Sequence, residues 1–247
     1  MMNGSTSAHD PVLETFVSLQ AMKELRRQGA IFYGERMMEA DTIAGHSFTV
    51  ACLAWFIAER WNKEHPESKV NVQKVLEMGL CHDMGEAITG DIPAPFKSKA
   101  EDQGMGGALE NAELAAFKDL ILPINELRED LPTILEEFDK LGSKEAAIVK
   151  VADRLDAYVH ALATQSVHRL VQAWGFYNKK LYDRLNKLGE NCQFWQWLAD
   201  WFRRACSFLG SASGLCPAIP RREIDFDDPQ WLPEFAKRGV ETNAAGP

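Results

Sequence analysis

The stretch GLCHDMGEAITGDIPAP, residues 79–95, carries several ionisable side chains among apolar and small ones. His82 and Asp83 are adjacent, Glu86 follows three residues after Asp83, and Asp91 lies five residues beyond Glu86. Imidazole nitrogen and carboxylate oxygen form a mixed donor set that suits Mn, Fe, Co, Ni or Zn better than Ca. Adjacent helical positions point about 100° apart, but both side chains can still reach one ion held beside the helix. A metal site and a simple polar patch are the two interpretations.

The apolar residues around His82 and Asp83 argue against a simple polar patch. Val75, Leu76, Leu80 and Ile88 indicate a helix that is buried over much of its surface. Unpaired ionisable groups would be costly to bury in such a place. A bound cation would compensate for that cost, although a His-Asp dipeptide is also common by chance.

Two other segments supply further candidate ligands. His46 lies on an apolar helix face, where a histidine is most simply part of the core. Asp153 lies in the largely apolar segment IVKVADRLDAY, where it is most simply paired with Lys150 or Arg154. A His, a His-Asp pair and an Asp on three separate helices could nevertheless converge on one ion, because helix bundles build metal sites from facing helices.

Helical periodicity dominates the elements that must position these residues. Helices are predicted from Asp10-Pro11 to Gly29, Thr42 to Trp61, Val72 to Thr89, Ala108 to Leu122, Leu131 to Leu141, Ser143 onward, His168 to Leu188, and Cys192 to Leu209. Two prolines argue against helix at residues 92–95, and residues 98–107 are polar and Gly-rich, which is typical of a loop. Almost no alternating strand pattern is present, so an all-α fold is predicted.

The length, net charge and cysteine content limit the classes of protein to which this chain can belong. A length of 247 residues fits one large domain, or one domain with an extension. The net charge of −9 argues against broad binding to nucleic-acid polymers or anionic membranes. The five Cys lack regular spacing, which predicts free thiols and a cytoplasmic location. We find neither a signal peptide nor an apolar run long enough for a membrane span.

The order His46, His82-Asp83, Asp153 resembles the H…HD…D pattern of the HD-domain metal-dependent phosphohydrolases. The segments GHSFTVA, HDMGEAITGDIPAPFK and VKVADRLDAYVHAL are similar to the branch that contains the 5′-deoxynucleotidases, over roughly residues 13–185. The resemblance implies an HD-domain helical bundle over residues 1–190, commonly assembled as a homodimer or higher homo-oligomer. Residues 191–247 then form an extension, an aromatic-rich helix and an irregular tail packed on the same domain.

The resemblance also implies a ligand set and a cofactor. His46, His82, Asp83 and Asp153 match the four protein ligands of one divalent transition metal ion, which could be Mn, Co, Fe, Ni or Zn. Such an ion leaves coordination positions open for water and a phosphate oxygen. It lowers the pKa of its water and polarises the phosphoryl group.

Further positions match residues that act on the substrate in this branch. Glu86 matches an acidic residue that assists catalysis, through proton handling or orientation of the water. Asp91 matches the Asp of TGDxP, which holds a sugar hydroxyl or helps proton transfer. Phe32 stands where the branch tends to have Trp beside the sugar, and this departure leaves discrimination between ribose and deoxyribose open.

Two cations are candidates for phosphate binding. Arg36 matches an Arg of these nucleotidases, and a guanidinium fork is well shaped for phosphate. A surface Arg paired with Glu35 or Glu39 is the simpler alternative. Lys97 matches the Lys that ends PxPxK, although it could equally be a solvated loop lysine.

The sequence therefore predicts an enzyme whose partner is a small nucleotide. The first hypothesis is a metal-dependent phosphohydrolase that removes phosphate from (deoxy)nucleoside 5′-monophosphates. The alternatives are a deoxynucleoside triphosphate phosphohydrolase that uses the same site, and a non-catalytic nucleotide-binding protein. The presence of both Glu86 and Asp91 argues against a pure binder.

Overall fold

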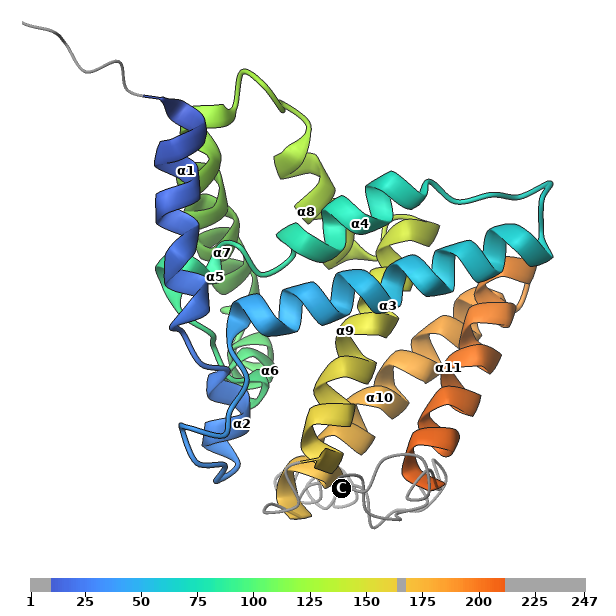
Figure 1. Ribbon diagram of the computed structural model, residues 1–247. Helices are drawn as coiled ribbons and strands as arrows, with labels where there is room; N and C mark the ends of the chain where they lie inside the picture. The colour runs from blue at the N-terminus through green and yellow to red at the C-terminus, as the bar shows by residue number, and fades with distance from the viewer. Residues whose placement is uncertain (1–9, 164–167, 212–247) are drawn as a thin grey trace, which may run out of the picture.

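The computed structural model describes residues 10–163 and 168–211, and within them we find helices and turns but no β-strand. The only extended pairing in this part of the chain is an isolated bridge between Arg26 and Thr42. Figure 1 shows the helices packed around a long central one, α3. The predicted all-α HD-domain bundle is therefore confirmed. None of the described helices is long and apolar enough to cross a membrane.

Three central helices form the framework of the site: α3 (Ile43–Glu64), α4 (Val72–Cys81) and α9 (Lys144–Ala163). Each begins at a residue whose side-chain oxygen accepts a hydrogen bond from a backbone N–H of the first turn, namely Thr42, Asn71 and Ser143. The three helices pack on one another and contribute most of the large buried core. Any side chains that face inward from all three therefore meet near the middle of the molecule.

Gly79 allows α4 to lie unusually close to α3. A Cβ atom at this position would lie 2.8 Å from the Cα of Ala51, a distance that real Cβ atoms essentially never show. The close approach of the two backbones fixes how far apart side chains on these helices lie.

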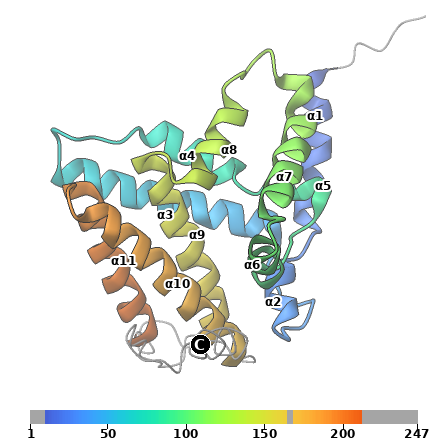
Figure 2. The same cartoon turned by 180° about the vertical axis from the view of Figure 1, so that it is seen from behind.

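The remaining helices lie on either side of this framework (Figures 1 and 2). On one side are α1 (Pro11–Leu19), η1 (Gln20–Lys23), α2 (Gln28–Phe32), α5 (Glu86–Thr89), α6 (Ala94–Asp102), α7 (Gly106–Ile121) and η2 (Leu122–Ile124). Helix α8 (Leu131–Lys140) packs against α4, α7 and α9. On the other side, α10 (His168–Gly189) and α11 (Gln193–Ser211) pack on each other and on α9.

The aromatic residues of α11 divide between core and surface contacts. Phe194 and Phe202 are buried in the main core, and the Phe194 ring meets the Trp61 ring edge-on. Trp197 is only partly buried, and its Nε1–H donates to Glu64. This helix thus packs on the same core as α3 and α9. The tail predicted after it lies outside the described residues.

Three sequence predictions were wrong in detail. The first helix ends at Leu19 and gives way to a 3-10 turn, with the short α2 replacing its predicted end. The predicted helix over residues 72–89 stops at Cys81 and resumes as α5. Helix α6 takes up residues 94–102 and thus overlaps both stretches predicted as non-helical, 92–95 and 98–107. This is possible because Pro95 occupies its first turn, where a missing N–H removes no hydrogen bond.

Candidate metal centre

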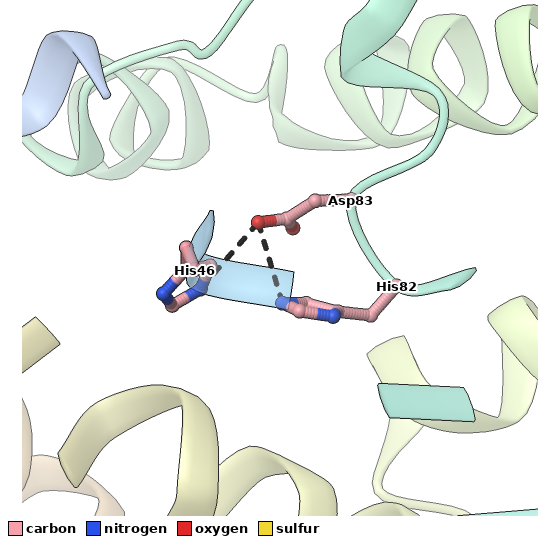
Figure 3. A group of neighbouring side chains, drawn as sticks. All are labelled: His46, His82 and Asp83. Atoms are coloured by element: carbon pink, nitrogen blue, oxygen red, sulfur yellow. Dashed lines mark ion pairs between the residues drawn. The ribbon is translucent and has the colours of Figure 1, made fainter. Parts of the chain in front are cut away.

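Two histidines and an aspartate meet where α3 faces the turn that follows α4 (Figure 3). The Nε2 atom of His46 lies 3.6 Å from Oδ2 of Asp83, and Nε2 of His82 lies 3.3 Å from the same oxygen. The three side chains offer ligand atoms that all lie within 4.8 Å of one another. This spacing suits the coordination sphere of a single ion.

Asp153 approaches the same point from α9. Its Oδ1 atom lies 3.3 Å from Nε2 of His46, and its other oxygen, Oδ2, faces Lys150 at 3.7 Å. The structure therefore brings together the four residues that the sequence singled out as ligands. They come from α3, the turn after α4, and α9, the three elements that pack at the centre.

Both imidazole rings are held with the same nitrogen pointing into the group. Nδ1 of His46 lies 2.7 Å from Oδ2 of Asp156, and Nδ1 of His82 lies 2.9 Å from the carbonyl oxygen of Gly79. The two Nε2 atoms are buried and have no hydrogen-bond partner. A buried unpaired nitrogen is costly unless it meets another group. Nδ1 bonds of this kind are how proteins orient histidines that bind metals through Nε2, so these residues fit a transition metal ion.

The carboxylates are held in their charged form. Burial alone would raise the pKa of Asp83, but His82 and Arg27 bring it well below its usual value. Burial likewise opposes ionisation of Asp153, yet the close contact with His46 and the charge of Lys150 lower its pKa well below the usual value. The partly buried carboxylate of Asp83 and the buried one of Asp153 remain anionic and provide the negative charge that a divalent cation requires.

The pKa of His46 is raised, in contrast to the lowered pKa values of the two carboxylates. Burial and the nearby Arg27 lower its pKa, but the close contact with Asp153, the hydrogen bond to Asp156 and the charge of Asp83 raise it overall. In the absence of a metal ion, the carboxylates therefore favour a protonated His46. A cation that binds here must displace that proton.

Glu86 lies at the start of α5, directly after the turn that carries the His-Asp pair. Its side chain is buried, and one of its oxygens has no hydrogen-bond partner. Burial raises the pKa of its carboxyl well above the usual value, and the charges of Asp83 and Asp91 raise it further. A carboxyl group with a raised pKa holds its proton more readily than an ordinary one, which is how proteins adapt carboxyl groups to act as general acids and bases.

Asp91 is positioned by the turn that ends α5. Gly90 has a φ of 72° and a ψ of 163°, a conformation that L side chains rarely adopt. Oδ2 of Asp91 accepts a hydrogen bond of 3.1 Å from the backbone N–H of Gly29 in α2. Asp91 thus lies between α5 and α2, close enough to Glu86 to influence its pKa.

The cation nearest to the metal candidates is one that sequence reasoning missed. Arg27 is partly buried, with a 17% exposed side chain, and its Nη1 atom lies 3.0 Å from Oδ2 of Asp83. Arg36, the predicted phosphate ligand, instead has an 83% exposed side chain that pairs with Glu39 at 3.4 Å. No contact joins Arg36 to the candidate ligands in the described part of the chain, so its placement matches the simpler surface interpretation. Arg27 stands beside Arg26 in an irregular stretch, and we find no sequence signal that distinguishes the two.

Lys97 and Phe32 occupy the rim of the same region. Lys97 lies on α6, where its Nζ atom is 2.7 Å from Glu113 and 3.9 Å from Glu86. Phe32 ends α2, and its half-exposed ring meets that of Phe96 edge-on, with the centroids 5.5 Å apart. Lys97 therefore lies next to the proposed proton-handling group, whereas the described contacts of Phe32 are with other aromatic rings.

Comparison with known proteins identifies the family of this chain and proteins of similar fold. Residues 14–192 match the family described as 5′-deoxynucleotidase YfbR-like. Proteins named 5′-deoxynucleotidase from Vibrio atlanticus (strain LGP32) and Vibrio cholerae serotype O1 are 32% and 31% identical over 162 residues, which cover 64% of this chain and 79% of each relative. In fold, the chain is similar to the PH0347 protein from Pyrococcus horikoshii OT3, with a TM-score of 0.58 and 24% identity over 78% of this chain and 97% of that one. The chain belongs to the YfbR-like 5′-deoxynucleotidase family, as its motifs predicted.

Proposed function

We propose that the protein hydrolyses (deoxy)nucleoside 5′-monophosphates to a nucleoside and inorganic phosphate, with one divalent transition metal ion as cofactor. The observation that carries the proposal is the meeting of His46, His82, Asp83 and Asp153 with both imidazole Nε2 atoms buried and unpaired. Family membership and the names of the relatives support a nucleotide as the substrate.

The charges of the site suit attack of water on phosphorus. A divalent ion held by the four ligands would supply Lewis acidity, which lowers the pKa of water and polarises the phosphoryl group. Glu86 is the group that accepts a proton from the attacking water or orients it, because it is buried beside the ligands and its pKa is raised. Asp91 then binds the sugar hydroxyl or takes part in proton transfer.

Arg27 takes the role that the sequence assigned to Arg36. Its guanidinium reaches Asp83 and has further N–H donors, which suit the oxygens of a phosphoryl group. Lys97 adds a second positive charge on the side of Glu86. Together these cations stabilise the negative charge that develops on the phosphoryl oxygens.

A nucleotide panel tests this function directly. The purified protein is loaded in turn with Mn, Co, Ni, Fe or Zn and incubated with nucleoside mono-, di- and triphosphates, and phosphate, pyrophosphate and triphosphate are measured. We expect release of inorganic phosphate from the monophosphates. Pyrophosphate or triphosphate release from the longer nucleotides alone would instead indicate a triphosphate phosphohydrolase, and tight binding without turnover in every metal would indicate a binding protein.

Two matched variants link the activity to the site. Glu86→Gln removes the ionisable group, whereas Glu126→Gln makes the same chemical change at an exposed position. We expect loss of turnover in the first and wild-type turnover in the second. Equal rates in both variants would exclude the proposed role of Glu86.

A homodimer or higher homo-oligomer in the cytoplasm is the assembly and location that we propose for the protein. Exposed aromatic side chains on α3, namely Phe48, Trp55 and Phe56, support self-association, because large apolar surfaces of this kind commonly contact another chain. Light scattering of the eluted protein measures the mass of the particle. A monomeric mass at micromolar concentration would contradict the proposed assembly.

A further inference from the structure

A cavity of about 520 Å³ lies next to the candidate metal centre, between α6–α8 on one side and α9–α10 on the other. Two of its lining lysines also contact residues of the centre. Lys97 lies 3.9 Å from Glu86, and Lys150 lies 3.7 Å from Asp153. The cavity therefore directly adjoins the candidate metal centre, and its volume is of the size that small ligands occupy.

Lys150 is an unusual member of this lining. Its side chain is 23% exposed, and its ammonium lies 3.9 Å from the centre of the Phe138 ring. Its one ion pair, with Oδ2 of Asp153 at 3.7 Å, is too long for a hydrogen bond. Within residues 10–163 and 168–211, no hydrogen bond engages its three N–H donors.

Other partly buried lysines in the chain are paired much more closely. Lys97 lies 2.7 Å from Glu113, and Lys74 lies 2.6 Å from Glu137. Lys150 is more buried than either of them, yet it lacks such a partner. An ammonium held in this way is costly unless another group completes its hydrogen bonds.

Asp153 does not complete them. One of its oxygens faces His46 at 3.3 Å, and only the other faces Lys150. A cation bound by Asp153 would draw on the same negative charge, so it would leave Lys150 even less compensated. The lining carries nearly balanced charges, with five cations (Lys97, Lys150, Arg154, Lys180 and Arg184) and four acids (Glu101, Glu110, Glu113 and Asp139), and the charge of Asp139 acts on Lys150 without a hydrogen bond between them in the described residues.

We propose that Lys150 binds the phosphoryl group of the substrate from the cavity side. This inference rests on the proposed function and adds a substrate-binding residue to it. Lys150 lies beside Asp153 and donates hydrogen bonds to the phosphoryl oxygens from that side of the metal centre. Arg27 lies beside Asp83 and donates from the other side. Its ammonium thereby gains the partner that the protein itself does not provide.

Three variants test the assignment. Lys150→Met keeps the length of the side chain and removes its charge, Lys150→Arg keeps the charge, and Lys140→Met is a control on an exposed lysine of α8. We expect kcat/KM for a nucleoside monophosphate to fall about 10- to 100-fold in Lys150→Met, which is the usual effect of losing a charge-assisted hydrogen bond. Lys150→Arg recovers part of this loss, and Lys140→Met behaves like the wild type.

Binding measurements separate this role from a structural one. The affinity for manganese is measured first, and the affinity of the manganese-saturated protein for inorganic phosphate is then measured by calorimetry. We expect Lys150→Met to keep its manganese affinity within about threefold and to bind phosphate about tenfold more weakly. An unchanged phosphate affinity, or a loss explained entirely by weaker manganese binding, overturns the assignment. The phosphate measurement needs no turnover, so it decides the role of Lys150 even if the nucleotide panel shows the proposed function to be wrong.

Discussion

Replacing Asp156 by Ala should weaken metal binding without removing any of the four candidate ligands. Oδ2 of Asp156 lies 2.7 Å from Nδ1 of His46, and the His46 side chain is only 2% exposed. The carboxylate therefore fixes both the rotation of the ring and the nitrogen that carries the proton. With Ala in its place, Nδ1 is left buried without this partner, and the ring can rotate away from Asp83 and Asp153.

The size of the effect follows from the strength of that contact. A hydrogen bond to a charged group contributes roughly 1.5–3 kcal/mol, which corresponds to a change of about 10- to 100-fold in a binding constant. Loss of such outer partners of metal-bound histidines typically weakens metal affinity over the same range. We therefore expect the Kd for manganese or cobalt in Asp156→Ala to rise about 10- to 100-fold at neutral pH.

Calorimetric metal titration of the purified protein measures this change. The control is Asp183→Ala, which removes an exposed carboxylate paired with Lys179 on α10. Circular dichroism and the melting temperature of the metal-free variants establish that both are folded. Equal Kd values for folded Asp156→Ala and the wild type would refute the idea that Asp156 orients His46.

Four further outcomes follow from the structure. Glu86→Gln should lower kcat by about 10²- to 10⁴-fold and leave the metal Kd nearly unchanged, because it removes proton handling and no ligand; unaltered turnover would contradict this. In the metal-free protein, Glu86 binds its proton more tightly in the folded than in the unfolded state. The free energy of unfolding therefore falls as the pH rises from the usual pKa of a Glu side chain, about 4.5, to the raised pKa of Glu86. The free energy of unfolding of Glu86→Gln, measured by denaturant titration relative to the wild type, should therefore increase with pH by up to about 1.4 kcal/mol per pH unit in that window. A difference that decreases with pH would show that the pKa of Glu86 is not raised by folding. Gly79→Ala should lower the free energy of unfolding by about 1–3 kcal/mol, since its Cβ meets the Cα of Ala51 at 2.8 Å. Arg27→Met should raise KM for a nucleoside monophosphate about tenfold or more and retain the metal, whereas an unchanged KM would remove Arg27 from the phosphate site.

The ligands could be predicted from the sequence because each lies in its own strongly patterned helix or next to one. His46 and Asp153 interrupt apolar faces, and polar residues at core positions are conspicuous without any structure. Their convergence was a hypothesis from their placement on three helices, to which the resemblance to the family added, and the packing of α3, α4 and α9 supplies its geometry. Local sequence thus indicated which residues to consider, and tertiary structure determined where they meet.

The break in the helix after Cys81 could not be predicted in the same way. Residues 72–89 contain no Pro, and the residue types of Asp83 and Gly85, which lie at the interruption, also occur inside helices. The break coincides with a close approach to another part of the chain, because a Cβ at Gly85 would lie 2.6 Å from the carbonyl oxygen of Glu113 in α7. A contact over such a distance in sequence leaves no local signal.

The place of Arg27 beside Asp83 could not be predicted for a related reason, and the sequence pointed only to Arg36. Both lie in the irregular stretch between α1 and α3, where no periodicity fixes the direction of a side chain. Arg27 turns inward because its backbone N–H donates to the carbonyl oxygen of Asp41 at 2.9 Å, next to the bridge between Arg26 and Thr42, which holds this segment against the start of α3. The match of Arg36 to a family arginine therefore gave no information about which arginine lies beside Asp83.

Gly79 shows how closely the packing and the chemistry of this protein are coupled. Its missing Cβ allows α4 to approach α3, which sets the distance between the His82 and His46 rings, whose centroids are 5.4 Å apart. Its carbonyl oxygen lies 2.9 Å from Nδ1 of His82 and thereby directs Nε2 toward Asp83. A side chain at this position would move α4 and the carbonyl together, so spacing and orientation would change at once. Loss of stability and loss of metal affinity should for that reason appear together in variants of Gly79, and separately in variants of Asp156, which orients His46 without setting the distance between the helices.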